Sequence, residues 1–164
     1  MDFRDALNNV IAELTPQPWD YTMASGTTLR VIPAGLPSGP GAAEVNVRIT
    51  RRDATGLYAF GITGPDSRGV AQVGVPTSVL PSLIKSLSGP PVQTADQDVW
   101  WESIDLVDGT LFVRVAPSGV AVTVTEVHSD GREEKVFATL PEAQRLPLAS
   151  ALGRALDVAR GWES

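Results

Sequence analysis

The chain contains no cysteine and only one histidine, His128. Without cysteine there is no disulfide, no thiolate nucleophile and no thiolate metal ligand. A lone histidine would need several carboxylates to complete a tetrahedral zinc site. His128, Ser129 and Asp130 are the residue types of a catalytic triad, but adjacent residues in a turn cannot form the geometry that proton relay through an imidazole requires. We therefore expect no catalytic residue, no metal and no cofactor.

Long apolar runs are also missing. No run approaches the ~20 residues that a membrane-spanning helix needs. The first residues, Met1-Asp2-Phe3-Arg4, lack the basic start and the apolar block of a secretory signal. We therefore expect a cytoplasmic protein without a membrane partner.

Basic residues are outnumbered, and lysine is scarce. Thirteen basic residues stand against 19 acidic ones, which gives a formal net charge of −6, and only two of the basic residues are lysine. Residues 1–97 carry seven Arg or Lys against eight Asp or Glu, whereas residues 98–164 carry six against eleven. The second half of the chain should therefore repel polyanions.

Nucleotide-binding and calcium-binding motifs are absent. The glycine-rich stretches contain neither Gly-x-x-x-x-Gly-Lys nor a strand-to-helix Gly-x-Gly-x-x-Gly. An acidic cluster lacks the glycine and the terminal bidentate glutamate of a calcium loop, and we interpret it as a solvated rim; it consists of Asp96, Asp98, Glu102, Asp105 and Asp108. An enzyme that uses Asp or Glu for acid–base chemistry is the least supported of three functional hypotheses, so we expect a non-enzymatic protein.

Residues 98–162 have the pattern of one unit of short strands closed by a helix. Four strands are expected, because the segments are rich in sheet-favouring residues or alternate with period two; they cover residues 99–105, 110–116, 120–127 and 134–139. A helix is expected to begin near Pro141 and to end at Gly161, with Pro147 kinking or restarting it. Its apolar stripe consists of Leu146, Ala149, Leu152, Leu156 and Ala159.

Residues 19–88 show a similar order, preceded by an amphipathic helix over residues 2–14. The expected strands of this half cover residues 19–23, 27–32, 44–51, 57–63 and 70–75. Residues 33–41 hold three Pro and three Gly and are expected to form a loop. A helix is expected after Pro76, with the apolar positions Val79, Leu80, Leu83, Ile84 and Leu87.

Set side by side, the two halves predict an internal repeat of residues 19–88 and 98–162 within a single domain, residues 1–164. Val47-Arg48-Ile49 parallels Val113-Arg114-Val115, and each half closes with a Pro-led, Leu-rich helix. The predicted fold class is α+β, with two repeated units of about four antiparallel strands followed by a helix, plus the N-terminal helix. At this length the chain can bury a sizeable core.

This order of elements resembles the group of Whirly, Pur-type and positive-cofactor-four-type proteins over most of residues 19–162. The chain has no Lys-Gly-Asn-Lys-Ala-type run and no dense basic hairpin, so the resemblance is one of element order. It implies curved sheets that bind single-stranded nucleic acid. The order helix, strands, helix, strands, helix is also similar to the type III secretion chaperone-like fold, which implies a small, acidic dimer that binds protein segments. The net charge fits this second resemblance better.

Trp100 and Trp101 are candidate partner-binding residues. Neighbours on a strand face opposite sides of the sheet, so the two indoles cannot both enter the same core. One of them needs another neighbour, and the sequence leaves open a covering helix, the other half of the molecule or a partner subunit. Aromatic residues are enriched in interface hot spots. With the acidic balance, this pair supports the first functional hypothesis, a chaperone-like and dimeric protein-interaction or adaptor module whose partner is another protein or a second copy of the chain.

Single-stranded nucleic-acid binding is the alternative hypothesis. Arginines are expected on or beside the outward face of the first sheet, and Tyr58 or Trp19 would supply a stacking surface, each stacked base being worth ~1–3 kcal/mol. The candidate nucleic-acid-binding residues are Arg30, Arg48, Arg51, Arg52, Tyr58 and Arg68. Such binding would depend steeply on salt, because it would release counterions from the nucleic acid.

Overall fold

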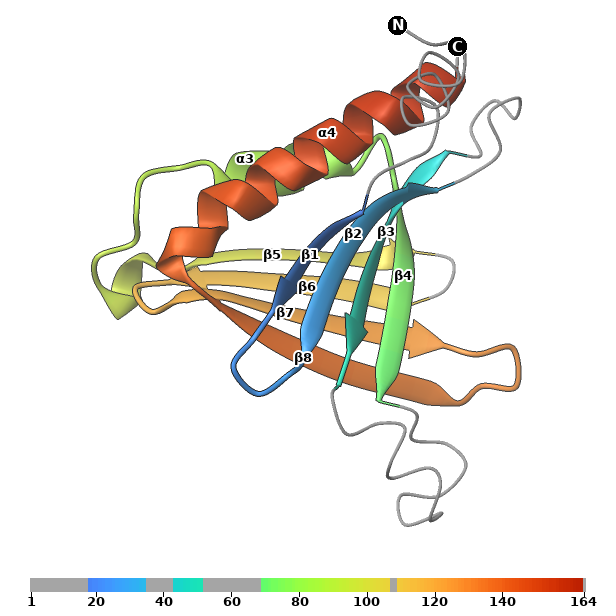
Figure 1. Cartoon of the computed structure of the whole chain (residues 1–164), viewed down its shortest axis with the longest axis horizontal. Helices are drawn as coiled ribbons and strands as arrows, with labels where there is room; N and C mark the ends of the chain where they lie inside the picture. Colours follow the sequence, from blue (N-terminus) through green and yellow to red (C-terminus); the bar gives the residue numbers. More distant parts are fainter. Residues whose placement is uncertain (1–17, 35–42, 52–68, 107–108, 164) are drawn as a thin grey trace, which may run out of the picture.

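The structure is a computed structural model, and it describes residues 18–34, 43–51, 69–106 and 109–163 (Figure 1). The predicted N-terminal helix over residues 2–14 and the predicted strand over residues 57–63 lie outside the described residues. The described chain forms two four-stranded antiparallel sheets and two α-helices, one of them C-terminal. The predicted α+β class is therefore confirmed.

The first sheet has the strand order β1-β2-β3-β4, in which every neighbouring pair is antiparallel. Its strands are β1 (Trp19–Thr22), β2 (Thr28–Ala34), β3 (Glu44–Thr50) and β4 (Val70–Pro76). In β3, Val45, Val47 and Ile49 are buried, while the residues between them are more exposed. The period-two prediction for this strand is confirmed.

Pro33 belongs to β2, although the sequence predicted that a loop begins there. It lies opposite Val45 in the β2–β3 ladder. A proline has no N–H to donate, so a sheet tolerates it where no neighbouring strand needs that donor. β1 pairs no farther than Trp19 with Val31, so β2 has no described neighbour on its other side at Pro33. The loop prediction was wrong for Pro33 and Ala34, and residues 35–42 lie outside the described residues.

The second sheet is a meander with the strand order β5-β6-β7-β8. Its strands are β5 (Val99–Leu106), β6 (Gly109–Ala116), β7 (Gly119–Val127) and β8 (Glu133–Pro141), which lie close to the four predicted segments. The backbone N–H of His128 donates to the carbonyl of Arg132 at 2.8 Å and closes the β7–β8 turn. His128 therefore lies in a turn, as the sequence predicted.

A helix follows each sheet. α3 (Leu80–Leu87) follows β4, and α4 (Arg145–Glu163) follows β8 through the 3-10 turn η2 (Glu142–Gln144). A second 3-10 turn, η1 (Ala95–Gln97), precedes β5. Leu80, Leu83 and Leu87 of α3 are fully buried, which confirms the main apolar positions predicted for this helix.

The start of α4 differs from its prediction. Because the η2 turn comes first, the α-helix begins only at Arg145, and Pro147 is its third residue. A proline in the first turn removes an N–H that has no intrahelical partner, so it forces no kink. The predicted apolar stripe is correct from Ala149 onward, but Leu146 is exposed and Leu148 is buried in its place.

The end of α4 also differs from its prediction. The helix continues past Gly161 to Glu163. A glycine is a frequent stop because it tolerates a positive φ, but Gly161 is not among the glycines with positive φ. The helix therefore has no left-handed cap at this residue.

The two sheets pack face to face with their strands crossing, so that β4 lies across β7 and β8 (Figure 1). α3 and α4 lie side by side, and α4 covers β2 and β3. The core between these layers is apolar, and its largest fully buried side chains include Leu29, Ile49, Leu80, Leu83, Leu87, Leu111, Leu140 and Leu152. Each sheet thus buries one face and leaves the alternate residues on the opposite face more exposed.

Each half consists of a four-stranded antiparallel sheet followed by a helix. The internal repeat of residues 19–88 and 98–162 remains an interpretation of that order. The sequence paired the segment around Arg48 with the segment around Arg114. Arg48 lies on the third strand of its sheet and Arg114 on the second strand of the other, so the strand order does not support this pairing.

Candidate interaction surface

Trp100 and Trp101 face opposite sides of β5, as the geometry of a strand requires. Trp101 lies opposite Val113, packs against the core, and its Nε1–H donates to the Oγ of Ser82 on α3 at 3.0 Å. Trp100 lies on the other face and is 58% exposed. A covering helix is therefore the neighbour of Trp101, and Trp100 remains the exposed partner-binding candidate.

Trp100 is held by two neighbours on the exposed face. Its ring and that of Phe112 have centroids 5.2 Å apart at an interplanar angle of 52°. The guanidinium carbon of Arg114 lies 5.0 Å from the centroid of the Trp100 ring, within the range of a cation–π interaction. These two contacts limit the rotational freedom of the Trp100 side chain, which is otherwise exposed to water.

Arg114 also forms an ion pair with Asp98, which precedes β5. The Nε of Arg114 donates to Oδ2 of Asp98 at 2.7 Å, and Nη2 donates to the same oxygen. The Asp98 side chain is almost fully buried, and its Oδ1 has no hydrogen-bond partner. Asp98 therefore offsets the charge of Arg114 and fixes the guanidinium beside Trp100. This assigns a structural contact to one member of the acidic cluster.

The register of the second sheet places further residues on this face. One row across the strands joins Trp100, Arg114, Ala121 and Thr139, and the next joins Glu102, Phe112, Thr123 and Phe137. Phe137 of β8 is 69% exposed. We call the exposed side of β5–β8 the outer face; its members include Trp100, Glu102, Phe112, Arg114, Ala121, Thr123, Lys135, Phe137 and Thr139.

Phe112 and Phe137 are not among the candidate residues predicted from the sequence. Both were detectable, because period-two alternation puts Phe137 in phase with the polar Lys135 and Thr139 on β8, and Phe112 in phase with the polar Thr110 and Arg114 on β6. On β5, the charged Glu102 likewise indicates that Trp100 faces solvent, since residues two apart on a strand share a face. An aromatic residue in phase with charged neighbours is the pattern to look for.

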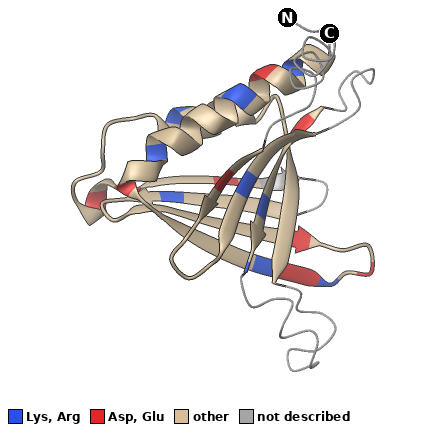
Figure 2. Ribbon diagram, viewed as in Figure 1, with Lys and Arg blue, Asp and Glu red and all other residues tan. Residues whose placement is uncertain are grey.

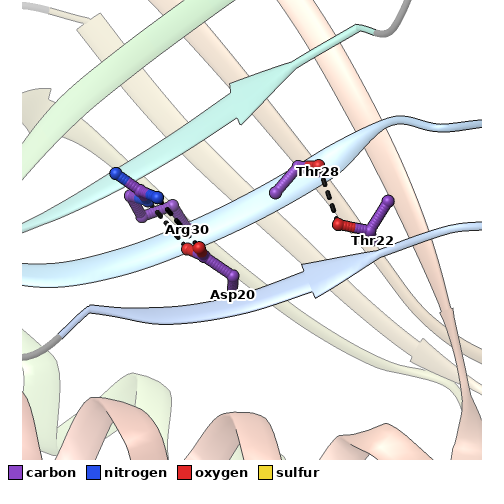
Figure 3. A network of polar contacts seen from close by, with 4 residues as sticks. All are labelled: Asp20, Thr22, Thr28 and Arg30. Atoms are coloured by element: carbon purple, nitrogen blue, oxygen red, sulfur yellow. Dashed lines mark hydrogen bonds and ion pairs between the residues drawn. The ribbon is translucent and has the colours of Figure 1, made fainter.

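The first sheet carries the arginines of the nucleic-acid hypothesis. Arg30 and Arg48 lie directly opposite each other on β2 and β3, and both are exposed. Arg30 forms a bidentate ion pair with Asp20 of β1, from Nε to Oδ1 at 2.8 Å and from Nη2 to Oδ2 at 2.9 Å (Figure 3). Hydrogen bonding to Asp20, and then its charge, raise the pKa of Arg30 above its usual value. Asp20 therefore offsets the charge of Arg30.

Of the remaining residues of that hypothesis, Arg51 and Trp19 lie in the described part of the chain. Arg51 follows β3, and its Nε is buried without a hydrogen-bond partner. Trp19 is half-buried and packs against the core. Arg52, Tyr58 and Arg68 lie outside the described residues. Figure 2 shows basic and acidic residues interspersed over both sheets and α4, without a basic stripe on the described ribbon.

A groove of about 690 Å³ lies between the β1–β2 turn and the ends of β6, β7 and β8. Arg114 is the charged residue of its described lining, and no Asp or Glu lines it. Among the described residues, no group of three or more Asp, Glu or His is placed to hold a metal ion.

Comparisons with known proteins add no family to this description. No protein-family model matches the chain, and no curated protein is similar to it in sequence. Among the described helices, none combines the length and the apolar character that crossing a membrane requires. The fold therefore defines the class of the protein, an α+β protein of two crossed four-stranded antiparallel sheets, and the outer face is its candidate site.

Proposed function

We propose that the chain is a non-enzymatic protein-interaction or adaptor module, chaperone-like in holding a polypeptide segment on the outer face of its second sheet. The observation that carries this proposal is the aromatic group of Trp100, Phe112 and Phe137 on one sheet face, in which Trp100 and Phe137 are exposed and Phe112 is half-buried beside Trp100. The fold does not need these rings in its core. Their exposure calls for another explanation, since an exposed aromatic patch typically marks a binding surface.

The chemistry of the surface favours protein over polyanion. Trp, Phe and Arg are enriched at the centres of protein interfaces, where a few residues carry most of the binding energy. Phe112 and Arg114 already hold the Trp100 ring, so binding would immobilise little additional side-chain freedom. Because Asp98 offsets the charge of Arg114, the surface is aromatic with little net positive charge. We expect an extended partner segment with apolar side chains.

Selection from a random peptide library tests this function, with the full chain as bait. The selected peptides should bind the wild-type chain, and Trp100→Ala should weaken them roughly thirtyfold, the equivalent of about 2 kcal/mol at a hot spot. Arg48→Ala is the matched control, because Arg48 is exposed on the other sheet, and it should leave the affinity unchanged. Selected peptides that bind Trp100→Ala as tightly as wild type would contradict the proposal.

Single-stranded nucleic-acid binding on the first sheet is the second candidate function. Two arginines stand directly opposite each other on an exposed face there, where like charges destabilise a sheet, and Asp20 forms its ion pair with Arg30. This candidate predicts binding of an oligonucleotide at low salt that falls steeply as salt is added. Arg48→Ala should then weaken binding, whereas Trp100→Ala should not.

A further inference from the structure

The two sheets of the described chain have four edge strands, β1, β4, β5 and β8. An edge strand presents unpaired backbone N–H and C=O groups, and proteins commonly shorten, distort or cover such edges to prevent pairing with other chains. Three of the four edges here are treated in one of these ways. Within the described residues, the fourth edge strand, β8, is neither short, irregular nor covered.

The protected edges differ in how they are blocked. β1 has only four residues. β4 lies across the second sheet, where Glu126 accepts a hydrogen bond from the N–H of Gln72 at 3.1 Å. β5 has an irregular register between Ser103 and Leu106, and α3 packs beside it. A bulge and a neighbouring helix both interrupt further pairing.

β8 is long, regular and open. It has nine residues, pairs with β7 without a break in register, and alternates between exposed and buried positions from Glu133 to Pro141. In the described chain it has no strand partner besides β7. Its free side is therefore a template for one more antiparallel strand.

The β7–β8 turn determines which residues of β8 offer that template. His128 and Arg132 are joined by a backbone hydrogen bond, so hydrogen-bonded and non-hydrogen-bonded pairs alternate from there along the two strands. The β8 residues in non-hydrogen-bonded pairs with β7 direct their backbone N–H and C=O groups to the open edge. Those that have both an N–H and a C=O to offer are Glu133, Lys135, Phe137 and Thr139. Their side chains all lie on the outer face.

We propose that a second copy of this chain pairs antiparallel along β8, about a two-fold axis at Val136. In this register Lys135 of each copy faces Phe137 of the other, and Glu133 faces Thr139. No like charges are opposed, and a cation faces an aromatic ring on both sides of the axis. The four pairs exchange about eight backbone hydrogen bonds.

Neighbouring registers of β8 are less complementary. An axis at Lys135 would bring the two Lys135 side chains opposite each other, which is unfavourable. An axis at Phe137 would place Glu133 opposite Pro141, which has no N–H to donate. The sequence of the strand therefore favours the axis at Val136.

Two-fold pairing also closes the assembly. Each copy uses its own β8 edge, so the interface is isologous and leaves no second open β8 for a third copy. The result is a continuous eight-stranded sheet that carries two Trp100 sites on one side. This pairing does not depend on the Trp100 surface binding another protein, so the two proposals fail separately.

Disulfide trapping tests the register, because the chain has no cysteine of its own. Lys135→Cys and Phe137→Cys both replace exposed residues. When the two variants are mixed and oxidised, the proposed pair has Cα atoms about 5.5 Å apart, inside the range for a disulfide. Either variant alone places its two cysteines roughly 9 Å apart, too far for a disulfide without backbone movement. The mixture should therefore cross-link and the single variants should not.

Mass measurement by light scattering tests the dimer itself. The wild-type chain should elute with twice its mass of 17.4 kDa. Phe137→Pro removes an N–H that is directed to the open edge and should give a monomer, while Phe137→Ala retains that donor and should keep a weaker dimer. A wild-type monomer at high concentration overturns the proposal. Equal cross-linking in the single variants and in the mixture overturns it as well.

Discussion

Glu134 of β8 accepts a hydrogen bond from the backbone N–H of Gly69 at 2.8 Å, and so ties the second sheet to the start of β4. Glu134 is only 5% exposed, and Glu126 lies directly opposite it on β7. Two facing carboxylates would repel each other. Each accepts an amide N–H from the first sheet, and these charge-assisted bonds offset the repulsion at the sheet corner.

Glu134→Ala should destabilise the protein by about 1–3 kcal/mol, because the amide of Gly69 would be left buried without an acceptor. Glu134→Gln keeps an acceptor oxygen and should cost less. Urea unfolding followed by circular dichroism measures both effects. Glu133→Ala is the control, since Glu133 is the exposed neighbour on the same strand. Equal losses for Glu133→Ala and Glu134→Ala would contradict the role of this contact.

Arg145 joins the two helices at the opposite end of the molecule. It is 2% exposed, its Nη1 donates to the carbonyls of Gly89 at 2.7 Å and of Leu87, and its Nε donates to Glu142 at 2.8 Å. The carbonyls at the end of a helix need partners outside it. Arg145 thus caps α3 from the first residue of α4.

Arg145→Ala should lower the free energy of unfolding by about 2–4 kcal/mol, since it removes three hydrogen bonds and leaves buried carbonyls unsatisfied. Arg145→Lys should recover part of this loss, because an ammonium keeps the charge but cannot reproduce the geometry of the guanidinium. Thermal unfolding measures the series. Arg154→Ala, an exposed position on the same helix, should change little. Full stability in Arg145→Ala would show that the cap is dispensable.

The two adjacent tryptophans should respond differently to truncation. Trp101→Ala removes a ring that packs on the core and bonds to Ser82, and should cost about 2–4 kcal/mol. Trp100→Ala removes an exposed ring and should cost less than about 1 kcal/mol. Chemical denaturation of the two variants under identical conditions compares them. A larger loss for Trp100→Ala would mean that the ring contributes mainly to stability and not to binding.

Local patterns in the sequence predicted most of the strands. The alternation of Val45, Val47 and Ile49 marks the buried side of β3, and the turn at His128 follows from residues next to each other in the chain. These features depend on short-range geometry, which the sequence carries directly. The predicted ends of strands were less accurate where the pairing with a neighbouring strand determines them. Pro33 is tolerated in β2 because the described pairing of β1 with β2 extends only to Val31, and no local pattern in the sequence reveals this limit.

The candidate site was predictable only in part. That Trp100 and Trp101 face opposite sides follows from strand geometry, but which one is covered depends on α3 packing beside β5. Phe112 lies beside Trp100 through the pairing of β5 with β6. The contact of Glu134 with Gly69 joins residues 65 positions apart. Such contacts arise from how the sheets cross, and one-dimensional periodicity does not contain that information.

The salt dependence of association separates the proposed dimer from nucleic-acid binding. Each chain carries a net charge of −6, so two copies repel each other at long range, and added salt screens this repulsion. The β8 interface consists mainly of backbone hydrogen bonds. The dimer should therefore persist or strengthen between low and high salt, as measured by sedimentation equilibrium. Oligonucleotide binding should weaken over the same range, because it releases counterions. A dimer that dissociates as salt is added would instead point to an interface held by opposite charges, which the proposed β8 register does not provide.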